Sequence, residues 1–498
     1  MNLKYALTGV AIVAASQVSF AQYSSDAFRF SQTQTGATSR IKAIGGASTA
    51  VGGDLSSVSG NPAGIGFFTR SELSVTPEFN NSQVNSNYFG QGNYSGNNKA
   101  NLNNASVVFY NQLSTARGRD KTTGWLSFNL GASYNRTNNF YRNEYYAGRN
   151  PTTSIANYYA QEANRDQSDN TLQAWAYNQN LIDLYKTSNQ YQSNVTSATN
   201  QASRTTSTGG QSEISLSAGA NYSNKLYLGF GIGITSLRYN KSSTFDENGT
   251  ASIFAPGSTT ATINSAYSSQ FYQDQATIGT GFNARVGFVY KPVEAVRIGA
   301  SFTSPTWMTV TDNYAEALQT EYSQDPGAYG NSNDQPYQAT YNLRTPLKAS
   351  GGVAVFIGKY GFISGDVEYV DYKGIKLSSG DYYVTQDNFN LSTLYKSTVN
   401  TRIGAEAKLD DFFIRGGFNY QGNPYVSNAT TGANVGSPVK TTSAGIGYRF
   451  GKYYVDATYQ YITHNTTVYP YELTGAVSPS ANLKNTYNNA FLTLGMRF

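Results

Sequence analysis

Histidine and cysteine, the residues best suited to catalysis, are almost absent from this chain. Its 498 residues include one histidine, His464 in "THNTT", and no cysteine. A serine hydrolase needs a histidine as general base beside a serine, and no predicted strand near His464 supplies that serine. No metal-ligand cluster, phosphate-binding loop or nucleotide fingerprint occurs either. The sequence therefore predicts no catalytic residue, no metal and no cofactor, and a protein that is not an enzyme.

Three arginines could hold an anion instead. Arg285, Arg402 and Arg415 lie in segments where polar and apolar residues alternate. A cation beside an apolar pocket suits the carboxylate head of an amphiphile. Whether these arginines can meet a ligand depends on which face of a sheet they occupy, so the strands that carry them must be identified first.

Alternation of apolar with small or polar residues is the dominant pattern of the chain. Examples are "LYLGFGIGI", "WLSFNLGASYN" and "YYVDATYQY". A period of two is typical of strands with one apolar face. We predict fourteen strands, at residues 72–80, 104–112, 123–136, 212–223, 225–239, 278–290, 296–306, 344–357, 361–372, 398–409, 412–420, 439–450, 453–463 and 486–498.

The connectors between these strands alternate in length. Only Asn224 follows the fourth strand, "GKY" the eighth, "DD" the tenth and "GK" the twelfth, whereas odd-numbered strands precede connectors of about 17 to 75 residues. Short turns at one end and long loops at the other are typical of outer-membrane barrels. The predicted fold class is all-β, a transmembrane antiparallel β-barrel of about 14 strands. A soluble sandwich or propeller also alternates, but it does not separate loop lengths in this way.

The N-terminus and the composition fit export. Lys4, an apolar run from Tyr5 to Ala15 and a small-residue site ending at Ala21 predict a signal peptide over residues 1–21. No later segment reaches the roughly 20 apolar residues that a membrane helix needs. With 35 basic and 30 acidic residues, the chain has no basic stripe for nucleic acid.

Strand parity assigns charged residues to the lumen. Both signs occur in similar number, which favours a lattice of ion pairs that braces the wall. Arg136 and Arg238 fall on the lipid face, each at the outer end of its strand, where the stem can snorkel. The inward set is Glu213, Arg285, Arg297, Lys348, Asp366, Glu368, Arg402, Glu406, Lys408, Arg415, Arg449, Asp456 and Arg497.

Five stretches together resemble the FadL/TodX family of outer-membrane transporters for long-chain fatty acids and other hydrophobic compounds. In chain order they are "GGDLSSVSGNPAGIG", "NARVGFVYKPVEAVRIGASFTSP", "GFISGDVEYVDY", "VNTRIGAEAKLDDFFIRGGFNY" and "SAGIGYRFGKYYVDATYQY". The resemblance covers essentially all of the chain after residue 21. It implies a fourteen-stranded barrel in the outer membrane of a Gram-negative-type bacterium.

The resemblance also implies a hatch, an N-terminal plug that folds into the lumen and carries an Asn-Pro-Ala turn. Asn61, Pro62 and Ala63 match that turn, so we expect the hatch at residues 22–70 and the barrel at residues 71–498. Glycines in this stretch allow close packing and sharp turns. A flexible leader is the alternative, but it would expose Ile65, Phe67 and Phe68 to water.

The resemblance further implies a route for a hydrophobic ligand. The ligand is caught on outer loops, moves to a lumen pocket and leaves sideways where the third strand kinks. Residues 123–136 alternate regularly, with only Gly131 as a site for a bend. In the loop at 150–200, Leu172, Trp175 and Leu184 recur at helical spacing and could line a capture groove or pack as a lid.

The expected function is passive uptake of hydrophobic compounds by a monomer that contacts outer-membrane lipid and lipopolysaccharide. Phe498 ends the last strand on an outward aromatic, which barrel-assembly machinery is expected to recognise. A general porin or a surface adhesin is the alternative, because a polar lumen and tyrosine-rich loops suit either.

Overall fold

The computed structural model describes residues 20–34, 36–114, 120, 122–185, 188–255, 258, 261–332, 336–426 and 435–498. The predicted signal peptide lies outside this part, except for its last two residues, which begin the first described helix. The proposed domain boundaries at residues 21 and 70 therefore stay predictions.

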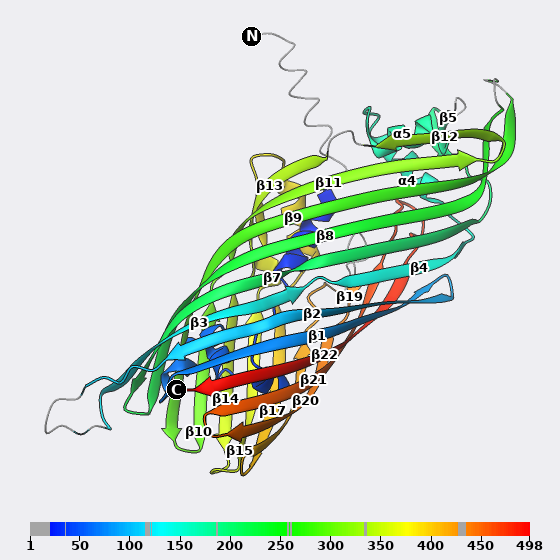
Figure 1. The fold of residues 1–498 in the computed structure, drawn as a ribbon. Helices are drawn as coiled ribbons and strands as arrows, with labels where there is room; N and C mark the ends of the chain where they lie inside the picture. Colours follow the sequence, from blue (N-terminus) through cyan, green and yellow to red (C-terminus); the bar gives the residue numbers. More distant parts are fainter. Residues whose placement is uncertain are drawn as a thin grey trace, which may run out of the picture.

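A closed antiparallel barrel forms the body of the structure (Figure 1). The ring closes because β1 pairs with the last strand, β22. Three of the fourteen wall strands are interrupted and carry two labels each. In chain order the wall strands are β1 (Glu72–Tyr88), β2 (Gln91–Phe109), β3 (Trp125–Asn139) with β4 (Arg142–Asn150), β7 (Thr199–Tyr222), β8 (Leu226–Phe254), β9 (Thr262–Val293), β10 (Val296–Thr303) with β11 (Trp307–Tyr322), β13 (Tyr337–Arg344) with β14 (Lys348–Phe356), β15 (Gly361–Val370), β17 (Thr398–Leu409), β18 (Phe412–Gln421), β20 (Val439–Phe450), β21 (Tyr453–Val468) and β22 (Ala481–Arg497).

All fourteen predicted strands coincide with wall strands, so the predicted fold class is confirmed. Many strands are longer than predicted: β8 and β9 have 29 and 32 residues. The prediction of a long loop after residue 80 is wrong. There β1 continues and turns at Phe89 and Gly90, whose φ angles of 48° and 82° suit a two-residue hairpin turn. Polar residues on both faces of this hairpin hide it from a search for apolar alternation.

The two faces of the wall differ as the alternation predicts. Phe230, Ile232 and Ile234 project outward from β8 and are exposed, whereas Glu213 and Asp366 point inward and are buried. In Figure 1 the short turns lie at the lower left beside the C-terminus, and β8, β9 and β11 run farthest to the upper right. No helix in the described part of the chain is long and apolar enough to cross a membrane.

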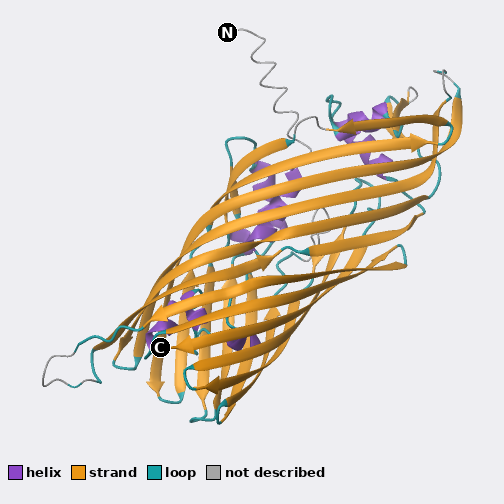
Figure 2. Ribbon diagram, in the orientation of Figure 1, coloured by secondary structure: helices purple, strands orange, loops and turns teal. Residues whose placement is uncertain are grey.

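The N-terminal segment, residues 20–34 and 36–70, lies inside the barrel (Figures 1 and 2). Ser39 N donates to Thr493 Oγ1 at 2.7 Å, Thr49 N to Asp366 Oδ2 at 2.9 Å, and Ser217 Oγ to Val58 O at 2.6 Å. Because β22, β15 and β7 lie far apart around the ring, the segment spans the lumen. Its helices are α2 (Phe20–Ser31), α3 (Ser39–Ala43), η2 (Leu55–Val58) and η3 (Pro62–Phe67).

Close approach between this segment and the wall depends on inward-facing glycines. A Cβ on Gly219 would lie 2.8 Å from Ile65 Cβ, and one on Gly417 would overlap the backbone of Ile44 and Gly45. Any larger residue at these positions would push the segment away from the wall.

The long outer connectors hold the remaining elements. These are α4 (Ile155–Arg165), α5 (Leu172–Asn178), β5 (Ile182–Tyr185), β6 (Gln190–Ser193), β12 (Asp325–Ser332), η4 (Tyr372–Gly374), β16 (Lys376–Ser378), α6 (Thr385–Leu394) and β19 (Val435–Gly436).

Helical spacing through Leu184 is a wrong prediction, because α5 ends at Asn178. Asn180 adopts a left-handed φ of 59°, and Leu181 N donates to Ala176 O at 2.9 Å. This is a Schellman-type stop, which asparagine tolerates. The chain then forms the β5–β6 hairpin, so Leu184 lies on a strand.

Candidate functional site

A lumen cavity of about 690 Å³ lies between the N-terminal segment and the wall. Its lining combines aromatic residues such as Phe28, Phe140 and Tyr239 with many hydroxyl and amide side chains. The lining also includes eight lysines and arginines but only four glutamates. The cavity therefore offers apolar surface together with an excess of positive charge.

Arg285 and Arg402 both line this cavity, and each already has a carboxylate partner. Arg285 Nη2 lies 2.6 Å from Glu213 Oε1, and Arg402 Nη2 lies 2.6 Å from Glu368 Oε1. These pairs confirm the ion-pair lattice expected from strand parity. An anionic ligand would have to share these arginines with their glutamates.

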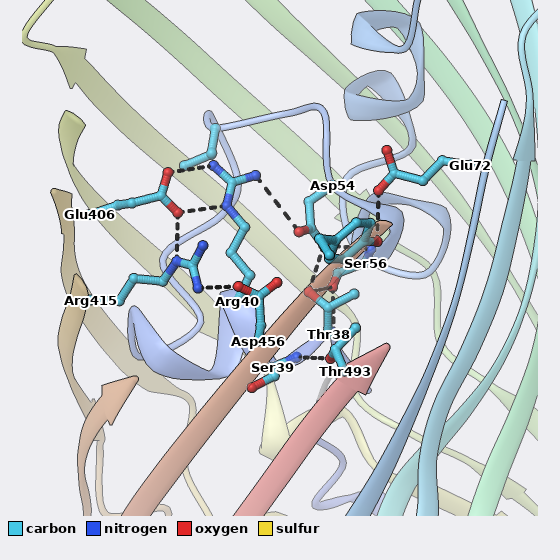
Figure 3. Close-up of polar contacts among 12 residues, drawn as sticks. Thr38, Ser39, Arg40, Asp54, Ser56, Glu72, Glu406, Arg415, Asp456 and Thr493 are labelled. Carbon is cyan, nitrogen blue, oxygen red and sulfur yellow. Dashed lines mark hydrogen bonds and ion pairs between the residues drawn. The ribbon is translucent and has the colours of Figure 1, made fainter. Parts of the chain in front are cut away.

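Arg415 lies elsewhere, in a charge network beneath the N-terminal segment (Figure 3). Its Nε contacts Glu406 Oε2 at 2.7 Å and its Nη1 contacts Asp456 Oδ1 at 2.5 Å. Arg40 of the N-terminal segment contacts the same Glu406 oxygen at 2.7 Å. The Arg415 side chain is fully buried. This network joins the segment to β17, β18 and β21, and Arg415 is not among the residues that line the cavity.

Lys241 and Arg136 are among the cavity cations that escaped the sequence analysis. Lys241 on β8 lines the cavity and has no hydrogen-bond or ion-pair partner among the described residues. Arg136, placed on the lipid face by parity, also lines the cavity and donates to Gly209 O at 2.9 Å. Its pairing with Ser212 is still regular, but the register shift that follows, between Arg136 and Asn138, turns the strand inward there. Lys241 belongs to a polar extension of β8 that apolar alternation could not reveal.

The wall is incomplete between β2 and the third wall strand. The ladder between β2 and β3 runs only from Phe109–Leu130 to Asn104–Asn135. Beyond it, residues 91–103 of β2 pair with β1 on one edge and have no ladder partner on the other among the described residues. We call the boundary between residues 91–103 and residues 136–150 the seam.

Side chains replace the ladder along the seam. Ser95 Oγ donates to Asn143 O at 2.8 Å, Asn93 Nδ2 to Ala147 O at 3.1 Å, and Ser86 Oγ to Tyr145 O at 2.7 Å. Ser86 belongs to β1, which lies on the other side of β2 from the third wall strand. The contact therefore means that β4 crosses the inner face of β2 to meet β1. The third wall strand therefore bends inward above Asn135.

The bend is not at Gly131. Gly131 pairs regularly with Val108 and Ser217, and the irregularity lies beyond it, between Arg136 and Asn138. A Cβ on Gly131 would lie 2.7 Å from Val58 Cγ2, so this glycine lets the N-terminal segment approach β3.

The N-terminal segment contacts the third strand where the bend begins. Gln34 N donates to Thr137 O at 2.8 Å, and Asn138 Nδ2 donates to Gln32 O at 2.9 Å. The rings of Phe30 and Phe140 meet edge-on, with centroids 5.9 Å apart. Displacement of this segment would thus act directly on the bent strand.

Asn61, Pro62 and Ala63 fix another part of the segment to the wall. Asn61 Oδ1 accepts from Ala63 N at 3.2 Å and caps η3, while its Nδ2 donates to Thr49 O at 2.7 Å and to Phe288 O at 3.2 Å. Pro62 is the first residue of η3, a position that needs no N–H. The motif thus joins two turns of the segment to β9.

Solved structures with the same architecture exist, although sequence comparison finds none. No protein-family profile and no curated protein sequence matches the chain. A FadL homologue from Pseudomonas aeruginosa matches with a TM-score of 0.52 at 13% identity, over 94% of this chain and 98% of that one. The fold is that of a FadL-type barrel. The toluene transporter TodX of Pseudomonas putida matches with a TM-score of 0.51 at 12% identity, over 94% of this chain and all of that one.

On this FadL-type barrel, the outer loops contain a buried apolar cluster of their own. Leu172 and Trp175 of α5 pack in a cluster with Ile155 and Tyr159 of α4 and with the outer ends of β8, β9 and β11. Leu184 is exposed. Of the two roles left open for this loop, packing as a lid is the one that Leu172 and Trp175 fit.

The remaining predicted residues of the FadL-type barrel have simple surroundings. Phe498 N donates to Ser71 O at 2.9 Å, and its exposed ring ends the wall beside the start of β1. His464 lies in β21 and stacks on Tyr487. Within the described residues, no three histidine, aspartate or glutamate side chains are grouped to hold a metal.

Proposed function

We propose that this protein takes up hydrophobic compounds, long-chain fatty acids or similar molecules, through the outer membrane of a Gram-negative-type bacterium. The ligand enters the lumen cavity from the outer loops and leaves sideways through the seam. Movement of the N-terminal segment, acting as the hatch, opens that exit.

One observation carries the proposal: the N-terminal segment contacts the third wall strand where that strand bends, beside the seam. At the end of the seam beside the exposed Leu102, β2 has no ladder partner on its seam edge among the described residues, although a sheet in hydrocarbon must satisfy its backbone internally. Lateral passage of an apolar ligand gives this gap a role. The FadL-type fold agrees with it, since a solved example is a toluene transporter.

The cavity cations support an acidic head group on the ligand. Arg285 and Arg402 are engaged by glutamates, but the Lys241 ammonium has no described partner. The aromatic side chains beside it would hold the apolar tail. We therefore expect carboxylates to bind better than neutral analogues of the same chain length.

Exposed apolar residues on the outer loops support capture there. Tyr177, Leu184 and Tyr185 project from the α5 and β5 region.

The exposed Phe498 ring would serve recognition by barrel-assembly machinery. We expect the protein to act as a monomer among outer-membrane lipid and lipopolysaccharide.

Reconstitution into liposomes tests this function. Proteoliposomes should bind and take up a fluorescent long-chain fatty acid and should swell slowly in isotonic sugar, because the N-terminal segment occupies the lumen. Empty liposomes are the control. Rapid sugar entry without fatty-acid binding would instead establish a general porin, and neither activity would favour an adhesin.

A further inference from the structure

The start of α2 lies against a buried acidic group on the outer loop helix α6. Ser24 N donates to Asp387 Oδ1 at 3.0 Å. Asp387 is fully buried, and its second oxygen, Oδ2, has no hydrogen-bond partner among the described residues. A buried carboxylate oxygen without a partner is costly, so the site lacks a donor.

The one charged side chain that acts on Asp387 among the described residues is Asp26, so no cation balances the Asp387 carboxylate. Asp26 and Asp312 are buried nearby, and Gln275 Nε2 donates to both, at 2.6 Å and 3.1 Å. Arg29 is paired with Asp26. Farther away, Lys241 interacts electrostatically with Arg29 and Asp26, and also with Glu144 and Glu316. Burial, with Asp26 nearby, raises the pKa of Asp387 from 3.8 to about 7.

Removal of the predicted signal peptide would create the missing cation at this place. Hydrolysis of the Ala21–Gln22 bond consumes one water, leaves a carboxylate on Ala21, and frees an amine on Gln22 that takes up a proton. Gln22 N is two residues before Ser24 N, or about 3 Å along a helix axis. Its ammonium would therefore lie next to Asp387.

We propose that signal-peptide removal completes the seating of the N-terminal segment, through an ion pair between the new α-ammonium of Gln22 and the Asp387 carboxylate. In the uncleaved chain the Gln22 nitrogen is an uncharged amide and cannot form this pair. Full closure of the lumen is thus reserved for the processed protein. The inference depends on cleavage after Ala21 and not on the identity of the transported ligand.

Labelling of the N-terminal amine tests the inference in the exported, detergent-purified protein. An amine-reactive ester is applied between pH 6 and 9, and labelling of the tryptic peptide Gln22–Arg29 is followed by mass spectrometry. An ammonium paired with a buried carboxylate should have a pKa at least one unit above the ordinary range of about 7.7–8.0, so it should react about tenfold more slowly at pH 7.

Asp387→Asn removes the charge but keeps the oxygen that accepts from Ser24 N. It should restore ordinary labelling, whereas Asp410→Asn, in an exposed turn on the far side of the barrel, should change nothing. The wild-type pH profile does not depend on how the variant folds. A first residue other than Gln22, cyclisation of Gln22 with loss of ammonia, or an ordinary amine pKa in the wild type would each overturn the inference.

Discussion

From β17 to β22 each wall strand pairs with the next along its length, whereas between β2 and the third wall strand the ladder stops at Asn104 and Asn135. The first region adds a buried charge network to its ladders, and the second relies on single side-chain hydrogen bonds. Both contact the N-terminal segment. The difference shows that one barrel combines a fully laddered wall, which we call the fixed wall, with a seam that is held by side chains.

The largest effect is expected from Arg415→Leu in the fixed wall. Asp456 would lose its ion-pair partner while it stays buried, which costs about 3–5 kcal/mol. Guanidinium unfolding in detergent micelles would show the loss. Lys291→Met removes an ion pair whose partner, Glu294, is exposed, so it should leave the unfolding midpoint unchanged. Equal effects of the two substitutions would mean that the network does not stabilise the wall.

Gly417→Ala should have a smaller effect in the same region. The added Cβ would overlap the backbone at Ile44 and Gly45, an overpacking that costs about 1–3 kcal/mol. Gly351→Ala is the matched control, since its Cβ would meet open space. Thermal unfolding of both variants compares them directly. A fully stable Gly417→Ala protein would contradict the close contact of the segment with β18.

Asn138→Ala should act at the seam and leave the wall intact. It removes the hydrogen bonds to Arg29 O and Gln32 O, each worth about 0.5–1.5 kcal/mol. Trypsin should then cut faster after Arg29, with no change in the global unfolding midpoint. Asn98→Ala, on the outward face of β2, should leave the cleavage rate at its wild-type value. A lowered midpoint would show that the seam and the fixed wall are not separate.

The last prediction concerns pH. In the uncleaved chain refolded in detergent, the raised pKa of Asp387 means that its contribution is complete below about pH 4 and is lost as the pH rises through about 7. The unfolding midpoint should therefore fall between about pH 4 and 7, and Asp387→Asn should flatten that fall. The exported, cleaved protein should show little of it, because the Gln22 ammonium keeps Asp387 charged. Identical pH profiles for the uncleaved and the cleaved protein would contradict an ion pair between Gln22 and Asp387.

The regularly paired part of the wall, β8 and β9 included, was predictable because its information is local. Phe230, Ile232 and Ile234 alternate with glycines, so period, length and face follow from the residues themselves, and the ion pairs of Arg285 and Arg402 follow from the same parity. The outer halves of β1, β2, β8 and β9 were missed because polar residues occupy both of their faces.

The seam was not predictable, because it depends on placement between strands. Residues up to Asn135 alternate regularly, and only the register shift after Arg136 turns the strand inward. Lys241 and Asp387 gain their significance from burial by residues distant in sequence. The end of α5 had a local signal in the sequence, because Asn180 is a residue type that tolerates the left-handed conformation after a helix. The apolar spacing that continues to Leu184 obscured this signal.

Cross-linking the seam tests the central claim most directly. The protein has no cysteine, so Ser95→Cys with Asn143→Cys would form a single disulfide between β2 and β4. Ser106→Cys with Ser133→Cys, an opposed pair within the intact ladder, is the control. Oxidation should abolish fatty-acid uptake in the first protein, a reductant should restore it, and the control should transport in both states. Full uptake through a completely oxidised seam would contradict lateral release.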